Sequence, residues 1–190
     1  MAMTVTRKKD TSLARVFVHK VADVRGGVSV ISSELNVDYL NEGRVVSAPD
    51  NGVCHVVKYA CVQAKATSSA TKIKVYKGHD FKVGDVICAA EGSAAYAITS
   101  IDASNAAYDE ISIGTTLGTA LTKDASFIYQ AKEAGASGSL LKYQPFALVG
   151  TGKPVVAKQN IDTDAWIIGV TRGNALPPLI EGKLKGIINY

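Results

Sequence analysis

Cysteine is scarce in this chain, and its spacing does not suggest a disulfide framework or a metal knuckle. Cys54, Cys61 and Cys88 are an odd number of thiols, so one stays free unless it pairs between chains. An unpaired thiol fits folding in a reducing cytosol. Structural zinc sites use closely spaced cysteine pairs, which these residues and the neighbouring His55 and His79 do not provide. We therefore expect buried thiols and no bound metal.

Long apolar runs and dense charge of one sign are also missing. No stretch is long and apolar enough for a membrane-spanning helix. The basic triplet Arg7–Lys9 is not followed by an apolar segment, so a secretory signal is not expected. With 21 Lys and Arg against 17 Asp and Glu, the net charge is only +4, and aromatics make up 7%. A nucleic-acid surface would need a denser basic stripe with interleaved aromatics. Neither a membrane nor a nucleic acid is an expected partner.

Motifs that carry catalysis or bind phosphate are incomplete. The nucleophile motif Gly-x-Ser-x-Gly does not occur. The stretch Gly150–Lys153 resembles the end of a phosphate loop, but Ala147 stands where the first glycine belongs and Pro154 follows the lysine. We therefore interpret it as a turn that enters a strand, and we expect no cofactor.

One pair of residues stays open as a reactive candidate. His79 is followed directly by Asp80, and a histidine with a carboxylate partner is part of many hydrolytic sites. Neighbours in sequence need not have that geometry, so the alternative is a turn in which Asp80 binds backbone groups. The close carboxylates Asp109 and Glu110, and Asp162 and Asp164, are interpreted as solvated turn residues because a glycosidase cleft would need more aromatics.

Alternating apolar and polar residues predict short strands through the middle of the chain. Thr71–Lys77 is the clearest, with Ile73 and Val75 on one face and lysines on the other. Turns rich in glycine and aspartate separate the further candidates, which are Val86–Ala89, Ala95–Ile101, Glu110–Ile113 and Ser126–Ala131. Strands at this spacing are typical of a small antiparallel barrel or sandwich.

The flanking regions are less regular but also favour strands. Candidates are Arg15–Val21, Val28–Ile31, Gly52–Val62, Lys153–Ala157 and Ala165–Thr171. The last is apolar on both faces, which predicts a central or interface position. Ser32–Leu35 could begin a short helix, and the spacing of Leu179, Leu184 and Ile188 is compatible with one short C-terminal helix.

These patterns predict a mainly β chain with three parts. Residues 1–50 form an N-terminal segment. Residues 51–134 form the central barrel or sandwich, and residues 135–190 add strands and a short helix that complete the fold.

The stretch Tyr76–Ile87, which contains Lys-Gly-His-Asp-Phe-Lys-Val-Gly-Asp, resembles the head fibre proteins of tailed bacteriophages and their prophages. In that family a similar turn is followed by strands like Ala97–Asp102 and Tyr108–Ile113. The C-terminal stretch Asp164–Gly173 and the closing Leu184–Ile188 resemble the family's ending. The similarity covers roughly residues 55 to 190, whereas the first 45 residues match nothing we can name. In the light of this resemblance, the N-terminal segment of residues 1–50 is interpreted as a capsid-facing or interchain arm.

The resemblance implies a structural virion protein, not an enzyme, on the outer surface of the head after synthesis in the host cytoplasm. It also implies a homo-oligomer, often a trimer, that binds the major capsid protein. The apolar run Trp166–Ile168 is then a candidate subunit interface. Two alternatives stay open: a monomeric cement or decoration protein, and a ligand-binding or hydrolytic β-domain that uses His79 and Asp80.

Overall fold

The computed structural model describes residues 15–190. The first 14 residues of the predicted arm, with the Arg7–Lys9 triplet, therefore lie outside the described residues. The described chain is mainly β, with antiparallel sheets and one short α-helix. Among these residues no helix is long and apolar enough to cross a membrane. The mainly β, antiparallel prediction is therefore confirmed.

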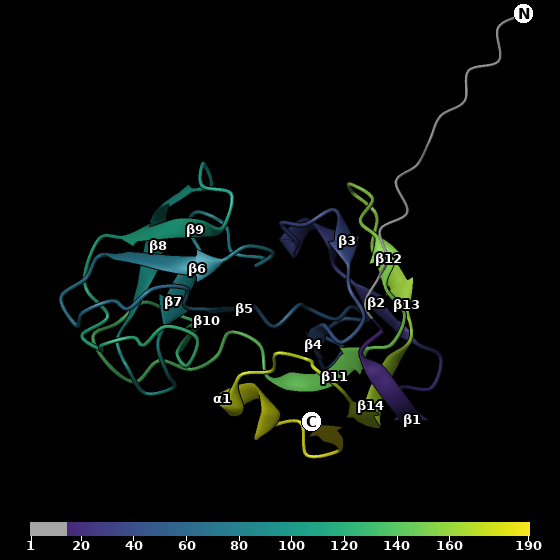
Figure 1. The fold of residues 1–190 in the computed structure, drawn as a ribbon. Helices are drawn as coiled ribbons and strands as arrows, with labels where there is room; N and C mark the ends of the chain where they lie inside the picture. Colours follow the sequence, from purple (N-terminus) through teal and green to yellow (C-terminus); the bar gives the residue numbers. More distant parts are fainter. Residues whose placement is uncertain (1–14) are drawn as a thin grey trace, which may run out of the picture.

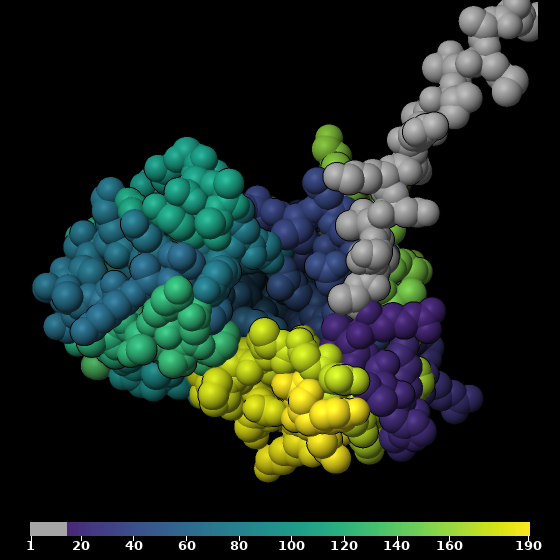
Figure 2. Space-filling model, in the orientation of Figure 1, coloured from purple at the N-terminus to yellow at the C-terminus, as the bar shows by residue number. Residues whose placement is uncertain are grey.

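The chain forms two lobes (Figure 1), and the middle of the sequence makes the second one. The first lobe combines strands from both ends of the chain, which Figure 2 shows as purple and yellow surfaces that meet beside the teal second lobe. Its strands are β1 (Phe17–Asp23), β2 (Val28–Val30), β3 (Tyr39–Leu40), β4 (Val45–Ser47), β11 (Pro145–Val149), β12 (Lys153–Pro154), β13 (Ile161–Thr163), β14 (Ala165–Thr171) and β15 (Ile187–Asn189).

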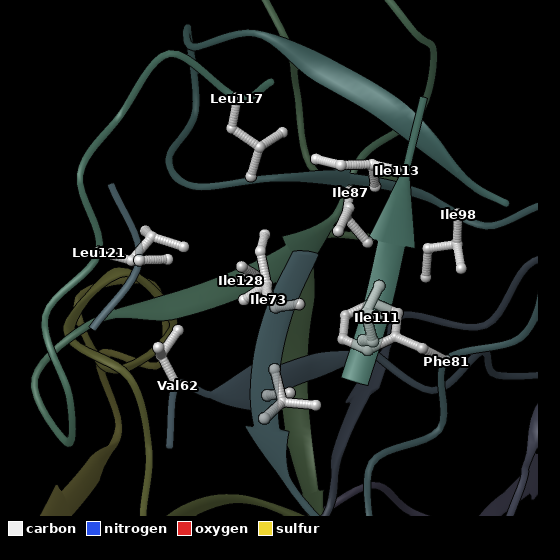
Figure 3. Close-up of a cluster of buried hydrophobic side chains, with 13 residues drawn as sticks. Val62, Ile73, Phe81, Ile87, Ile98, Ile111, Ile113, Leu117, Leu121 and Ile128 are labelled. Atoms are coloured by element: carbon white, nitrogen blue, oxygen red, sulfur yellow. The ribbon is translucent and has the colours of Figure 1, made fainter. Parts of the chain in front are cut away.

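The second lobe is one six-stranded sheet in the order β5-β10-β7-β8-β9-β6. All of its strands contribute to one apolar cluster, shown in Figure 3. The edge strands β5 and β6 are linked only by an isolated bridge between Val62 and Val75, so the sheet curls around its core without forming a closed barrel. The strands are β5 (Tyr59–Cys61), β6 (Lys72–Tyr76), β7 (Val86–Cys88), β8 (Ala95–Asp102), β9 (Tyr108–Ile113) and β10 (Phe127–Gln130).

Strand β14 is the central strand of the first lobe, as its apolar character on both faces predicts. It pairs with β1 along one side and with β11 and β15 along the other. The three remaining pairs of this lobe, β4 with β11, β2 with β13 and β3 with β12, join segments about a hundred or more residues apart in sequence. The three-part division of the chain stays a prediction.

The C-terminal helix is shorter than its apolar spacing allows. Helix α1 spans only Pro178–Glu181, and Ile187–Asn189 instead forms β15, which pairs in parallel with β14. Gly186 lies so close to the backbone of Ile167 that a Cβ there would be 2.4 Å from its carbonyl oxygen. The predicted extension of the helix to Ile188 is therefore wrong, because pairing with the central strand outweighs the weak helical propensity of a stretch with two glycines. The short helix predicted at Ser32–Leu35 is present as a 3-10 helix, η1 (Ser32–Glu34).

Three apolar clusters hold the molecule together. One fills the second lobe, and another lies within the first lobe around Val30, Leu40 and Val149. The remaining cluster spans both lobes, since it joins Val45 and Leu148 of the first lobe to Tyr129 of the second. The lobes therefore share apolar contact on one side of their boundary, and polar contacts occupy the rest of it.

Candidate functional site

The turn with the sequence Lys-Gly-His-Asp-Phe-Lys-Val-Gly-Asp lies at the boundary between the lobes. We call Lys77–Asp85, the segment between β6 and β7, the boundary turn. Gly78 and Gly84 have φ angles of +84° and +93°, a region that strongly favours glycine. Asp85 closes the turn, since its carboxylate accepts the Lys82 amide at 2.9 Å while its own amide donates to the Lys82 carbonyl at 3.0 Å. The chain thereby reverses direction and presents several side chains to the first lobe.

His79 is a buried member of this turn, with 5% of its surface exposed. Its Nδ1 accepts a hydrogen bond from the Phe81 amide at 3.2 Å, so Nε2 carries the proton of the neutral ring. Nε2 lies 3.2 Å from Asp109 Oδ2, within ion-pair distance but outside hydrogen-bond geometry. Burial lowers the pKa of His79 despite the opposing effect of Asp109.

Asp80 faces the opposite way from His79, across the boundary. Its carboxylate forms an ion pair with the Arg44 guanidinium and accepts the Asn36 amide at 3.2 Å. Arg44 also donates to the Gly78 carbonyl at 2.8 Å. Only 2% of Asp80 is exposed, so its charge is compensated almost entirely by residues of the first lobe.

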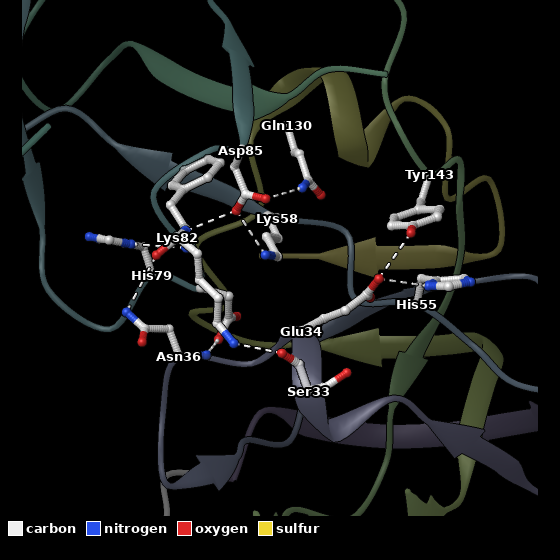
Figure 4. Close-up of polar contacts among 12 residues, drawn as sticks. Ser33, Glu34, Asn36, His55, Lys58, His79, Lys82, Asp85, Gln130 and Tyr143 are labelled. Carbon is white, nitrogen blue, oxygen red and sulfur yellow. Dashed lines mark hydrogen bonds and ion pairs between the residues drawn. The ribbon is translucent and has the colours of Figure 1, made fainter. Parts of the chain in front are cut away.

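Two further bonds connect the boundary turn to the segment that contains η1, as Figure 4 shows in part. The Lys82 ammonium donates to the Ser33 carbonyl at 2.6 Å, and the Asn36 side-chain amide donates to the Phe81 carbonyl at 3.4 Å. Together with the bonds to Asp80, these contacts dock the turn on the first lobe. We call this set of contacts the latch.

Another polar group lies where the chain crosses between the lobes. Lys58 is buried just before β5, and its ammonium pairs with Asp85 Oδ2 at 2.8 Å. Gln130, at the end of β10, donates its side-chain amide to the other Asp85 oxygen at 2.8 Å and its backbone amide to the Lys58 carbonyl at 3.0 Å. Asp85 thus binds both crossing segments.

A third group of polar side chains connects η1 to His55 and Tyr143 (Figure 4). Glu34 Oε1 accepts the Tyr143 hydroxyl and contacts His55 Nδ1, each at 2.9 Å. The imidazole of His55 stacks on the Tyr143 ring with centroids 4.0 Å apart. Burial and the hydrogen bond to Glu34 raise the pKa of Tyr143, so its hydroxyl is a stable donor. These contacts fix the segment that carries the latch residues Ser33 and Asn36.

A cleft of about 280 Å³ opens at the edge of the boundary, and both lobes line it. The charged groups on its wall already have partners within the protein: Arg44 binds Asp80, and Lys77 binds Asp109 and the Ala103 carbonyl. The Asn174 side-chain amide donates to the Gly43 carbonyl at 3.1 Å. Of these contacts, the pair of Arg44 and Asp80 crosses the boundary, and the others fix the wall of the cleft within each lobe.

The residues proposed from sequence fall into different surroundings. His79 and Asp80 are adjacent in the turn but contact Asp109 and Arg44 respectively, so the structure separates the suggested pair. Within residues 15–190 no three metal-ligating side chains come together. The cysteines and histidines considered as metal ligands have other surroundings: Cys54 and Cys88 are buried thiols, Cys61 is half-buried, and His55 and His79 make the contacts described above.

Two carboxylates differ from their expected role as solvated turn residues. Asp109 is buried within β9, where it compensates Lys77, so the prediction is wrong for this residue. Asp164 accepts the Trp166 indole N–H at 2.6 Å and lies 3.5 Å from the Lys20 ammonium. Burial raises the pKa of Asp164, but hydrogen bonding from Thr151 and Trp166 and the charge of Lys20 outweigh it and hold the pKa below the usual value. Both carboxylates are structural anchors.

Sequence reasoning did not find the first-lobe half of this site. Asn36 and Arg44 lie 44 and 34 residues from the groups that they bind, and Glu34 lies 109 residues from Tyr143. No local pattern marks these residues, because each has an ordinary polar side chain on a loop or in the single turn of η1. Comparison of the chain with models of protein families, with curated proteins and with solved structures finds no match.

Proposed function

We propose that this chain is a structural virion protein: a head fibre of a tailed bacteriophage or prophage that forms homo-oligomers, with trimers expected. It attaches through the major capsid protein to the outer surface of the head after synthesis in the host cytoplasm. It acts without catalysis or a cofactor. The observation that carries the self-association is an exposed apolar face on β1, β14 and β15 of the first lobe.

Strands β14 and β15 supply the continuous part of this face. Ile168 and Val170 are two residues apart on β14 and so point to the same side of the sheet, and Ile188 of β15 pairs with Val170. Ile168 is 45% exposed and Ile188 is 65% exposed. Large apolar side chains that neighbour one another on a sheet surface mark an interaction site more strongly than scattered ones.

Strand β1, which pairs with β14, adds two more exposed apolar side chains at irregularities in its pairing. Register shifts against β14 leave Val18 and Val21 without a directly paired residue, and the two valines are 56% and 58% exposed. Bulges of this kind redirect side chains and make an edge strand a poor template for strand addition. This favours association of a second copy through the face of the sheet over extension of its edge.

The predicted interface run contributes unequally. Ile168 belongs to the apolar face, whereas Ile167 packs against the apolar cluster inside the first lobe. Trp166 is half-buried, with Lys20 over its ring and its indole N–H bonded to Asp164. We therefore assign Ile168, and not Trp166, to the subunit interface.

The boundary turn supports a structural role as well. One of the stretches through which the chain resembles head fibre proteins, the turn within Tyr76–Ile87, contains residues that dock one lobe on the other. His79 and Asp80 are nearly inaccessible and already bonded, which favours the fibre over a hydrolytic or ligand-binding domain. A fixed angle between lobes is what a rigid capsid appendage requires.

The test is the native mass of the purified chain by light scattering over a salt series. We expect a salt-resistant oligomer, because apolar association is not screened by salt. Ile168→Asp with Ile188→Asp should give a folded monomer. Val83→Asp is the matched control, since Val83 is 63% exposed on the boundary turn, away from this face, and its change should leave the oligomer intact. A monomeric wild type would overturn the fibre.

Attachment is tested by co-sedimentation with purified heads of the phage whose genome encodes the chain. We expect the wild-type oligomer to sediment with heads that lack it. A monomeric wild type that still sediments with heads would instead identify a cement or decoration protein. Deletion of residues 1–14 tests the predicted arm: loss of sedimentation with an unchanged native mass would assign capsid binding to that segment.

A further inference from the structure

His79 has an environment that accommodates only its neutral ring. Nδ1 is the acceptor for the Phe81 amide at 3.2 Å, so it has no proton, and the side chain is almost fully buried. The Phe81 ring lies beside the imidazole with centroids 5.6 Å apart and is itself fully buried in the second-lobe core. A second proton on this imidazole would sit on Nδ1 and would place its N–H against the N–H of Phe81.

Three charged groups, Asp109, Asp80 and Arg44, lie close enough to His79 to affect its protonation. Asp109 of β9 lies 3.2 Å from Nε2, and its carboxylate is already paired with Lys77. Asp80 of the same turn also favours the charged ring, but the Arg44 guanidinium next to Asp80 opposes it. The two anions near His79 are therefore each shared with a cation, and their support for an imidazolium is smaller than the opposing effect of burial.

The hydrogen bond from Phe81 to His79 supports the latch. Phe81 presents its carbonyl to the Asn36 side chain, and Asp80, which lies between His79 and Phe81, binds the Asn36 amide and Arg44. Loss of the bond at Nδ1 releases the peptide segment that carries all of these acceptors. The change at one ring nitrogen thus reaches the contacts between the lobes.

We propose that His79 is an acid-sensitive lock on the boundary turn, and that protonation of its Nδ1 undocks the turn from Asn36 and Arg44 of the first lobe. The lobes stay connected through their shared apolar cluster and the crossing segments, so opening is a local hinge motion. The inference is independent of the proposed virion role.

The direction of the pKa shift agrees with this lock. Burial is the main cause that lowers the pKa of His79 below its ordinary value. A lowered pKa means that the docked state favours the neutral ring, so the stability that it contributes is complete above the ordinary histidine value of about 6.5. That stability is lost as the pH falls from there through the pKa of the docked state.

The test is amide hydrogen exchange of the full-length chain at several pH values, corrected for the intrinsic rate. In the wild type we expect the protection of the Phe81 and Asn36 amides to fall about tenfold or more between about pH 7 and about pH 4.5. The substitution His79→Asn retains an acceptor near the position of Nδ1 and does not take up a proton in this range. It should keep the latch protected at acidic pH.

Two controls make the result specific. His19→Asn removes an exposed histidine of β1 and should behave like the wild type. Nitrogen chemical shifts of the wild-type His79 ring report its tautomer directly, so the proposal remains testable if His79→Asn does not fold. Loss of protection that follows protonation of this ring supports the lock. A ring that stays neutral while protection is lost, or equal acid sensitivity in a folded His79→Asn, overturns it.

Discussion

The Arg44 guanidinium and the Asp80 carboxylate form an ion pair across the boundary between the two lobes. This pair explains why Asp80 follows His79 without forming a reactive unit with it. Consecutive residues in an extended turn point in opposite directions, so His79 faces Asp109 inside the second lobe while Asp80 faces the first. Two neighbouring side chains of the turn therefore contact different lobes, His79 the second and Asp80 the first.

Removal of the Asp80 carboxylate should weaken the fold strongly. In Asp80→Ala the Arg44 guanidinium retains only the Gly78 carbonyl, and the Asn36 amide loses its acceptor. Because an isolated charge is left in a largely buried place, we expect a loss of about 3 kcal/mol in the free energy of unfolding, measured by urea denaturation.

The matched control for Asp80 is the pair of Lys72 and Glu110 on the surface of the second lobe. The Lys72 side chain is 66% exposed, so the pair is largely solvated. We expect Glu110→Ala to change the free energy of unfolding by less than about 0.5 kcal/mol. Equal losses in the two variants would contradict the assignment of Asp80 to a buried latch.

The second lobe could be predicted from the sequence, because its strands carry local signals. Alternation in Lys72–Tyr76 and Tyr108–Ile113 and the turn residues between the strands define these elements over a few residues each. Antiparallel pairing of the successive strands β7, β8 and β9 then follows, whereas β5, β6 and β10 pair with strands that are not their neighbours in sequence. Whether the sheet closes into a barrel could not be predicted, because closure depends on how the edge strands β5 and β6 meet. In the structure a single bridge between Val62 and Val75 joins them, and the barrel is not closed.

The first lobe and the latch could not be predicted in the same way. Pairing of β1 with β14 or of β3 with β12 joins the two ends of the chain, and no local pattern specifies the partner. Asn36 and Arg44 are ordinary loop residues until the boundary turn comes against them. The sequence prediction for Asp109 is wrong because an acidic pair suggests solvent, whereas the burial of Asp109 beside His79 is a tertiary effect.

Gly150 is predicted to tolerate no side chain. A Cβ at this position would lie 2.2 Å from both Asp164 Oδ2 and the Trp166 indole nitrogen. Gly150→Ala should therefore displace the indole and cost about 1–3 kcal/mol, as overpacking does. Trp166 is the only tryptophan, so its fluorescence emission reports the displacement directly.

Gly114→Ala is the control for this substitution. The nearest atom to its added Cβ would be a Thr99 methyl at 3.8 Å, an ordinary contact. We expect unchanged tryptophan emission and a stability equal to or slightly above that of the wild type. An unshifted emission in Gly150→Ala would show that the Trp166 pocket is looser than its contacts imply.

The stability of the boundary should also fall in alkali. Burial raises the pKa of Tyr129, in the apolar cluster that both lobes share, to about 12. A raised pKa means that the fold favours the neutral phenol, so its contribution is complete below the ordinary tyrosine value of about 10. The contribution is lost as the pH rises from there toward 12.

Thermal unfolding between pH 8 and pH 11.5 measures this effect, together with absorbance of the phenolates. We expect the melting temperature to decline with the late phenolate phase. In Tyr129→Phe that phase should shrink and the decline should be shallower, because no proton is then released from this site. The same decline in both proteins would assign the alkaline sensitivity to other groups.

The ion pair of Lys58 and Asp85 provides the sharpest test of how the crossing segments are held. Lys58 is 4% exposed and has Asp85 as its partner, whereas Asp85 also accepts from Gln130 and the Lys82 amide. Asp85→Asn leaves a buried ammonium without an anion, for which we expect a loss of about 3–5 kcal/mol. Lys58→Met leaves a carboxylate that still has two donors, so its loss should be smaller.

The double variant separates charge compensation from simple loss of contact. With Lys58→Met and Asp85→Asn combined, no unpaired charge remains at the crossing, and the amide of Asn can still bond Gln130. We expect the combined loss in urea denaturation to fall short of the sum of the single losses by more than about 1 kcal/mol. Strict additivity would mean that the two groups do not compensate each other. Asp85 would then stabilise the turn alone, and the orientation of the lobes would depend on the latch and the shared apolar cluster.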